Sequence, residues 1–140
     1  MVDLTASIAI GAEAERTIMV TPELTVAHAY PGLPAVYATP QMIALMEMAA
    51  ADAIAALLPP GWVSVGTHID VRHLAATPLG MQVVARARVI EVSARAVRFA
   101  VSAHDGVEGI GEGFHIRSPI ARSRCNEGVA RKIALSGARA

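Results

Sequence analysis

Three polar residues have types and positions that could perform acid–base chemistry, and the first is Glu47. It lies in the apolar-rich run 41–58, beside Ile43 and Ile54 at 100° per residue, and no basic residue is three or four positions away. A carboxylate at the edge of an apolar stripe needs a partner from another element of the fold. Glu47 is therefore either a structural acid near the rim of a helix or a catalytic group.

His73 is the second candidate. It ends the segment 63–73, in which residue types alternate, and its parity places it with Ile69 and Val71 on the apolar face. A lone histidine on such a face is more often a satisfied core residue than a catalyst. However, the unpaired carboxylate of Glu47 is expected on the opposing helix, and a Glu–His pair in an apolar cleft is what general-base chemistry needs. We therefore expect Glu47 and His73 to lie together.

Thr39 is the third candidate, because its position allows two compatible roles. Thr39 followed by Pro40 is the order expected at a helix start: a hydroxyl that satisfies free amides, then a residue that lacks an amide proton. The sequence thus predicts Thr39 as the N-cap and Pro40 as the first helical residue. A hydroxyl and free amides at a helix N-terminus can also orient a water molecule or stabilise an oxyanion.

Other residues give weaker signals. His68 and Asp70 share the polar face of their segment and could form half of a metal site, but no second cluster has ligand spacing, so no metal is expected. Gly66 interrupts a predicted strand, which indicates a β-bulge or close approach of the backbone to a ligand. Cys125 lies outside the apolar pattern, and we expect no role for it.

The elements that must position these residues follow from periodicity. The run 41–58 is rich in Ala, Met, Leu and Ile, and Pro59-Pro60-Gly61 ends it, which predicts a long and mostly buried helix. Alternation predicts strands, and in the last of them Ile110, Phe114, Ile116 and Ile120 are expected on the core face. The predicted strands are 16–21, 63–73, 81–89, 97–104 and 110–120, and a short C-terminal helix is expected near 126–135.

The order of these elements indicates the fold. One strand, one long helix and four strands joined by short turns, each with one apolar face, are typical of an antiparallel sheet curled around a helix. This α+β arrangement matches the hotdog fold, here as a single domain over residues 1–140. The high apolar fraction set against a single long helix predicts that further surface is buried by self-association, and the usual unit of that fold is a dimer.

Composition narrows the class of protein. Of 140 residues, 54% are hydrophobic and 17% are charged, and the net charge is zero, which argues against disorder and against nucleic-acid binding. Acidic residues predominate in 1–60 and basic residues in 117–140. The single cysteine suits a reducing cytoplasm, no secretory signal is evident, and the run 41–58 is too interrupted to span a bilayer. We expect a cytoplasmic protein.

With these residues in place, the chain resembles the fluoroacetyl-CoA thioesterase-like family of hotdog-fold acyl-CoA thioesterases. The resemblance runs from about residue 21 to residue 132 and rests on separated polar residues in the right order, together with a His-Asp-Gly turn. The segments that carry it are Val36-Tyr37-Ala38-Thr39, Leu45-Met46-Glu47, Gly66-Thr67, His73-Leu74-Ala75-Ala76-Thr77-Pro78, the stretch 101–107 and Ile110-Gly111.

The resemblance implies a role for each matched residue. Thr39, Glu47 and His73 fall on the family's catalytic threonine, glutamate and histidine, and Gly66 falls on a glycine whose amide helps to hold the thioester carbonyl. Glu47 would be the nucleophile or the base that activates water, His73 would handle protons, and Thr39 would hold Glu47 or water. The family acts without metal or added cofactor, since CoA belongs to the substrate, and it is dimeric with sites at the subunit interface. Arg117, in the basic C-terminal third, is expected to contact the phosphates of CoA.

The sequence also departs from the family. The segment 30–33 looks shorter than the lid that precedes the catalytic threonine, and Leu33 stands where a lid phenylalanine would be expected to contact the acyl group. This argues against fluoroacetyl specificity and leaves hydrolysis of a short or small acyl-CoA as the expectation. The alternatives are a hotdog hydratase or dehydratase that acts on acyl thioesters, and a non-catalytic acyl-CoA-binding protein.

Overall fold

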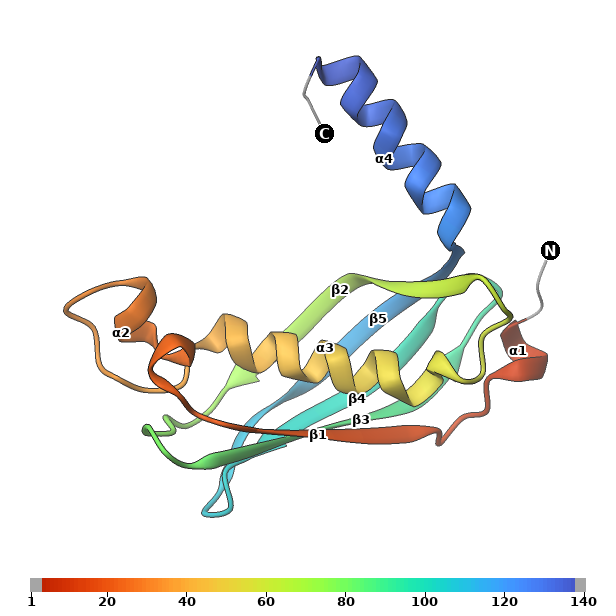
Figure 1. Cartoon of the computed structure of the whole chain (residues 1–140). Helices are drawn as coiled ribbons and strands as arrows, with labels where there is room; N and C mark the ends of the chain where they lie inside the picture. Colours follow the sequence, from red (N-terminus) through yellow and green to blue (C-terminus); the bar gives the residue numbers. More distant parts are fainter. Residues whose placement is uncertain (1–3, 138–140) are drawn as a thin grey trace.

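A five-stranded antiparallel sheet curls around one long helix, α3 (Figure 1). The computed structural model describes residues 4–137, and the strand order is β1-β3-β4-β5-β2, with β2 at one edge. The predicted hotdog architecture is confirmed. The elements are α1 (Leu4–Ser7), β1 (Glu13–Met19), a 3-10 turn (Pro22–Leu24), α2 (Val26–Ala29), α3 (Thr39–Ala55), β2 (Trp62–His73), β3 (Gln82–Val92), β4 (Val97–His104), β5 (Gly109–Ala121) and α4 (Arg122–Ser136).

The ends of α3 differ from the prediction. Thr39 is the first helical residue, the N-cap is Ala38, and no side chain caps the helix. Thr39 is therefore not the N-cap, because its hydroxyl bonds to His73 instead of to a free amide of its own helix. At the other end the helix stops at Ala55 rather than at residue 58, and Leu57 donates its amide to the carbonyl of Ile54 in the closing turn.

The core lies between α3 and the concave face of the sheet. Side chains of β3 and β4 point alternately into it, as the period-two pattern predicts, and Val89 and Phe99 are fully buried. Gly111 of β5 lets the helix approach, because a side-chain carbon there would lie 2.5 Å from the sulfur of Met42. The helix contributes Met42, Leu45, Met46, Ala49, Ala50 and Ile54 to this core.

A β-bulge divides β2 and corrects the predicted face pattern. The register against β5 shifts between Gly66 and His68, as the glycine in this strand suggested. Because the extra residue reverses the parity, Val63 and Val65 lie on the opposite face from Ile69, Val71 and His73. The expectation that all odd positions from 63 to 73 share one face was therefore wrong for its first part.

The predicted core face of β5 was also wrong. Phe114 is 40% exposed and lies under the guanidinium of Arg98 on the outer face, whereas His115 and Arg117 are buried on the inner face. Arg117 pairs with Val97 in the register with β4, and Val97 is fully buried. Of the four residues predicted to face the core, only Ile110 is buried.

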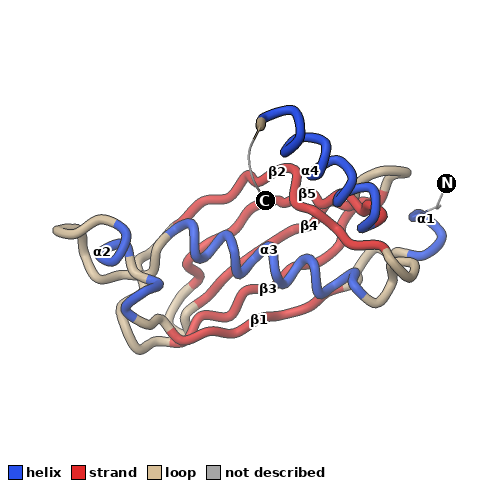
Figure 2. The backbone as a smooth tube through the Cα atoms, turned by 45° about the horizontal axis from the view of Figure 1, so that its top comes forward, coloured by secondary structure: helices blue, strands red, loops and turns tan. Residues whose placement is uncertain are grey.

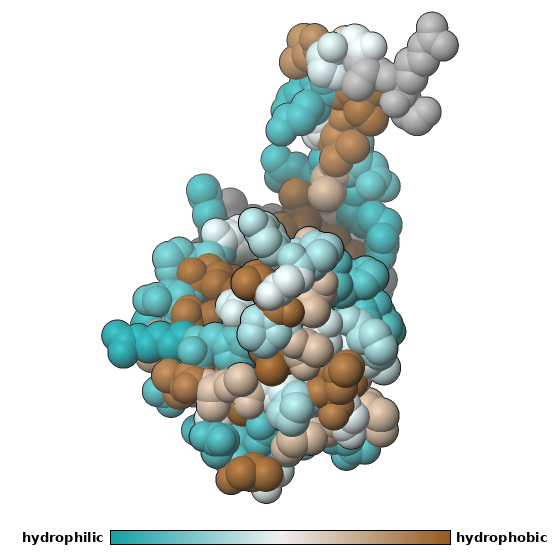
Figure 3. Space-filling model, turned by 90° about the vertical axis from the view of Figure 1, so that its left-hand side faces the viewer, coloured by the Kyte–Doolittle hydropathy of each residue, from teal (hydrophilic) through white to brown (hydrophobic). Residues whose placement is uncertain are grey.

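Helix α4 starts at Arg122, four residues earlier than expected, and extends from the end of β5 beyond the edge strand β2 (Figures 1 and 2). None of its residues is buried, and it stands clear of the rest of the molecule as a mostly hydrophilic column (Figure 3). Isolated helices of this length are marginal in water, and α4 buries none of its residues against the rest of residues 4–137. Within residues 4–137, no helix is long and apolar enough to cross a membrane.

Candidate active site

Thr39 and His73 form one half of the candidate site. The hydroxyl oxygen of Thr39 lies 2.6 Å from Nδ1 of His73, which joins the first turn of α3 to the last residue of β2. Both residues line a cleft of about 340 Å³ whose other walls come from the segments before α3 and after β2. Leu33 does not line this cleft and is 44% exposed.

The surroundings of His73 favour the neutral ring. Burial lowers the pKa of His73 below its ordinary value of 6.5, and a backbone hydrogen bond at Ala75 only partly opposes this effect. Its Nε2 atom is buried and has no hydrogen-bond partner within residues 4–137. If the Thr39 hydroxyl donates to Nδ1, the proton resides on Nε2 and is available to a substrate oxygen. An unpaired buried nitrogen is costly unless another molecule completes it.

Glu47 belongs to a second polar group, centred on Gly66. A side-chain carbon placed on Gly66 would lie 3.3 Å from Oε1 of Glu47, 3.5 Å from Nη1 of Arg117 and 3.1 Å from Cε1 of His115. Gly66 therefore keeps open the space between one carboxylate and one guanidinium. The carboxylate is half-buried and makes no hydrogen bond or ion pair with residues 4–137. A reacting group could therefore approach it above Gly66.

Arg117 is held rigidly inside the protein. Its Nε and Nη2 atoms donate to the hydroxyl and the carbonyl of Ser64, each at 2.8 Å, and its Nη1 lies 3.2 Å from Nε2 of His115. Burial lowers the pKa of Arg117, and the charge of Glu47 raises it. Arg117 is only 8% exposed, so water screens little of the attraction between its guanidinium and the nearby carboxylate of Glu47. The expected contact between Arg117 and CoA phosphates does not fit this buried position.

His115 completes the network around Arg117. Its Nδ1 lies 2.8 Å from the carbonyl of His68, so Nδ1 carries the proton and Nε2 accepts from Arg117. Burial lowers the pKa of His115, and the positive charge of Arg117 acts in the same direction. The ring is therefore neutral and fixed in one tautomer. Sequence reasoning missed His115, although its alternation with Arg117 on β5 was a visible signal.

The two polar groups do not meet within one chain. Thr39 and Glu47 are eight residues apart on α3, which is about 12 Å along the helix axis. The charge of Glu47 affects the pKa of Arg117 and of His115, but burial and a backbone contact account for His73. The expectation that Glu47 and His73 form a pair is therefore not met inside a single chain.

Asp105 has a structural role in the His-Asp-Gly turn. Burial would raise the pKa of Asp105, but hydrogen bonds from the Glu108 and Val107 amides and from the Thr77 hydroxyl bring it below its usual value. The bond from Thr77 ties the β4–β5 turn to the segment that follows His73. No three His, Cys, Asp or Glu side chains in the described part of the chain could share a metal ion.

The curled sheet, its central helix and the polar groups beside β2 define a hotdog-fold protein, and comparisons with known proteins agree. The family model of FlK, the fluoroacetyl-CoA-specific thioesterase, matches residues 20–123. A fluoroacetyl-CoA thioesterase of Streptantibioticus cattleyicolor is 41% identical over 129 residues, which cover 88% of this chain and 93% of the relative.

Solved structures give the same result. A structure of the fluoroacetyl-CoA thioesterase FlK matches with a TM-score of 0.84 and 40% identity, covering 89% of this chain and 97% of that one. A thioesterase superfamily member of Thermus thermophilus matches with a TM-score of 0.84 and 30% identity, covering 92% and 95%. The chain belongs to the family of the fluoroacetyl-CoA-specific thioesterase and is a thioester hydrolase that acts on acyl-CoA.

Proposed function

We propose that this protein is a cytoplasmic, metal-independent thioesterase that hydrolyses a short or small acyl-CoA, using Thr39, Glu47 and His73 in a homodimer. The proposal is carried by one observation: the carboxylate of Glu47 and Nε2 of His73, which have no hydrogen-bond partner within residues 4–137, both face the inner side of β2. Relatives support the substrate class, since one solved structure of FlK is a complex with acetyl-CoA and another with fluoroacetate and CoA.

Each proposed residue has a chemical task. Glu47 attacks the thioester carbonyl carbon, or removes a proton from the water that does. The amide of Gly66 holds the carbonyl oxygen, on which negative charge develops. His73, oriented by Thr39, polarises the thioester and delivers a proton to the departing CoA sulfur. Overall, water adds across the acyl carbon–sulfur bond and yields a carboxylic acid and free CoA.

The proposed homodimer would bring the two halves of the site together. β2 is an edge strand of 12 residues, none of them buried, and such an edge is a template for pairing with another chain. Antiparallel pairing of two copies about a two-fold axis through Asp70 sets His73 of one copy opposite the bulge at Gly66 and Thr67 of the other. His73 and Gly66 both lie on the inner face, so the Thr39–His73 pair would meet the Glu47 group across the interface.

The size of the acyl group follows from the residues before α3. Tyr30 and Leu33 are both exposed, 67% and 44%, and neither lines the cleft at Thr39. The position expected to carry a lid phenylalanine, Leu33, therefore carries a smaller side chain that does not line this cleft in a single chain. We propose that the enzyme accepts small acyl groups without selecting for fluorine.

A panel of thioesters tests the proposed function. We expect free-thiol release from acetyl- to butyryl-CoA and from fluoroacetyl-CoA at comparable rates, unchanged by EDTA, and slower release from octanoyl- and phenylacetyl-CoA. Enoyl-CoA in the same panel separates the alternatives, because a hydratase consumes it without releasing thiol. Thiol release from none of these esters would contradict the proposal, and a strong preference for fluoroacetyl-CoA would contradict its acyl-group part.

Arg117 provides a prediction about charge. Arg117→Met removes the cation that lies within about 7 Å of the Glu47 carboxylate, across the space that Gly66 keeps open. We expect kcat/KM for acetyl-CoA to fall about tenfold or more, because the carboxylate loses the positive charge beside it. Arg98→Met is the matched control, because Arg98 lies over Phe114 on the outer face. A kcat/KM in Arg117→Met equal to that of the control would contradict this role.

A further inference from the structure

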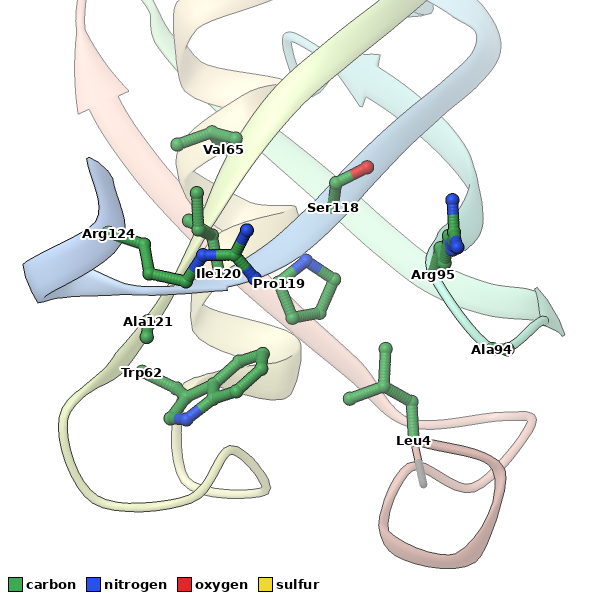
Figure 4. A pocket seen from close by; sticks show the side chains of 10 residues that line it. All are labelled: Leu4, Trp62, Val65, Ala94, Arg95, Ser118, Pro119, Ile120, Ala121 and Arg124. Carbon is green, nitrogen blue, oxygen red and sulfur yellow. The ribbon is translucent and has the colours of Figure 1, made fainter. Parts of the chain in front are cut away.

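A second cleft, of about 500 Å³, lies at the other end of β2 from His73 (Figure 4). It is bounded by the start of β2, the end of β5, the β3–β4 turn and the first turn of α4. Its volume is within the range of small-molecule sites. None of Thr39, Glu47 and His73 lines it, so the proposed thioester chemistry leaves this cleft without a role.

The lining combines two cations with an aromatic ring. Arg95, from the β3–β4 turn, and Arg124, from α4, lie on different sides of the cleft, and Trp62 forms part of its wall (Figure 4). No acidic residue lines it, and neither arginine forms an ion pair within residues 4–137. Two unpaired guanidinium groups near an indole suit a ligand that carries both phosphate groups and a planar base.

The cleft adjoins the Glu47 group along β2. Val65 lines the cleft, and the next residue, Gly66, faces Glu47 and Arg117. Trp62 lies on the same face of β2 as Gly66, whereas Val65 lies on the other face, so residues from both faces of this edge strand line the cleft. A ligand with a phosphorylated nucleotide at one end and a thioester at the other could therefore occupy the cleft and reach Glu47.

We infer that the cleft between Trp62, Arg95 and Arg124 binds the 3′-phosphorylated ADP end of coenzyme A. The inference rests on the proposed function, in which the thioester end of an acyl-CoA lies at Glu47. The cleft would then contact the nucleotide end of the same molecule. The guanidinium groups bind phosphates and the indole stacks on adenine. It also replaces the phosphate contact expected at Arg117, which is buried and whose three nitrogens each already hydrogen-bond to Ser64 or His115.

Fluorescence tests nucleotide binding without any catalysis. Trp62 is the only tryptophan of the chain, so its emission reports on the cleft directly. We expect adenosine 3′,5′-bisphosphate and CoA to change this emission in a saturable manner. Arg95→Ala and Arg124→Ala should each weaken binding about tenfold or more, since each removes charge-assisted hydrogen bonds. Arg131→Ala, the same change elsewhere on α4, is the control and should bind as wild type does.

Kinetics then show which part of the substrate uses the cleft. Arg95→Ala and Arg124→Ala should raise KM for acetyl-CoA with little change in kcat, and leave KM for the acetyl thioester of N-acetylcysteamine, which lacks the nucleotide, unchanged. Equal effects on both esters, or no change in Trp62 emission on adding nucleotide, would overturn the inference. Free nucleotide could also change both the emission of Trp62 and the rate at which the short ester is hydrolysed. This result would overturn the inference as well, because it would indicate that the cleft binds a separate regulatory nucleotide. Loss of all thiol release with normal nucleotide binding would instead count against the proposed function alone.

Discussion

Replacing Glu47 with glutamine should lower the rate of acyl-CoA hydrolysis about a thousandfold, because an amide can neither attack the thioester nor accept a proton from water. Glutamine has the same shape, and the carboxylate makes no hydrogen bond or ion pair within residues 4–137 that the change would break. The free energy of unfolding should therefore change by no more than about 0.5 kcal/mol. Thiol release and urea unfolding measure the two effects.

Asp52 offers a matched control on the same helix. Its carboxylate pairs with Arg16, with Oδ2 2.6 Å from Nε, at the exposed side of α3. Asp52→Asn makes the same chemical change away from β2 and should leave turnover as in the wild type. If Glu47→Gln hydrolysed acetyl-CoA at the wild-type rate, Glu47 would be a structural acid, which is the other reading that its sequence position allows.

Much of the fold could be predicted from the sequence because its two periodicities are strong. The helix α3 and the strands β2 to β5 follow from apolar spacing. Their ends differ from the prediction by at most three residues, because the contacts that end each element are not visible in the sequence. Thr39 shows the reason: its hydroxyl could cap α3 or bond to a distant side chain, and only the fold brings His73 within 2.6 Å.

The faces of two strands could not be read from hydropathy. The bulge near Gly66 reverses the parity of β2, and a pattern of residue types does not show where an extra residue is inserted. In β5 the apolar residues Phe114 and Ile116 suggest a core face, but the interior takes His115 and Arg117 because their hydrogen bonds are satisfied there.

The candidate site was only partly predictable. Thr39, Glu47, Gly66 and His73 were found by type and position, but Glu47 and His73 were expected to pair in one chain. The spacing of eight residues between Thr39 and Glu47 already argued against one histidine contacting both. The spacing is compatible with a shared site if Glu47 comes from one copy and Thr39 and His73 come from the other.

Mixing two inactive variants should restore activity. If Glu47 of one copy acts with Thr39 and His73 of the other, a heterodimer of Glu47→Gln and His73→Ala chains has one site with both residues altered and one intact site. Random assembly makes about half of the dimers heterodimers, so the mixture should recover about a quarter of wild-type turnover. Mixing His73→Ala with Thr39→Ala should restore nothing, because these two residues bond within one chain and neither site is intact.

The most direct measurement uses purified heterodimers. Glu47→Gln and His73→Ala chains that carry different affinity tags are coexpressed, and the doubly tagged species is isolated and assayed for thiol release from acetyl-CoA. A site shared across the β2 edge predicts about half of the wild-type turnover per dimer, since one site of two is intact. Turnover no higher than that of either parent variant, in a heterodimer that is folded and stable, would contradict the shared site.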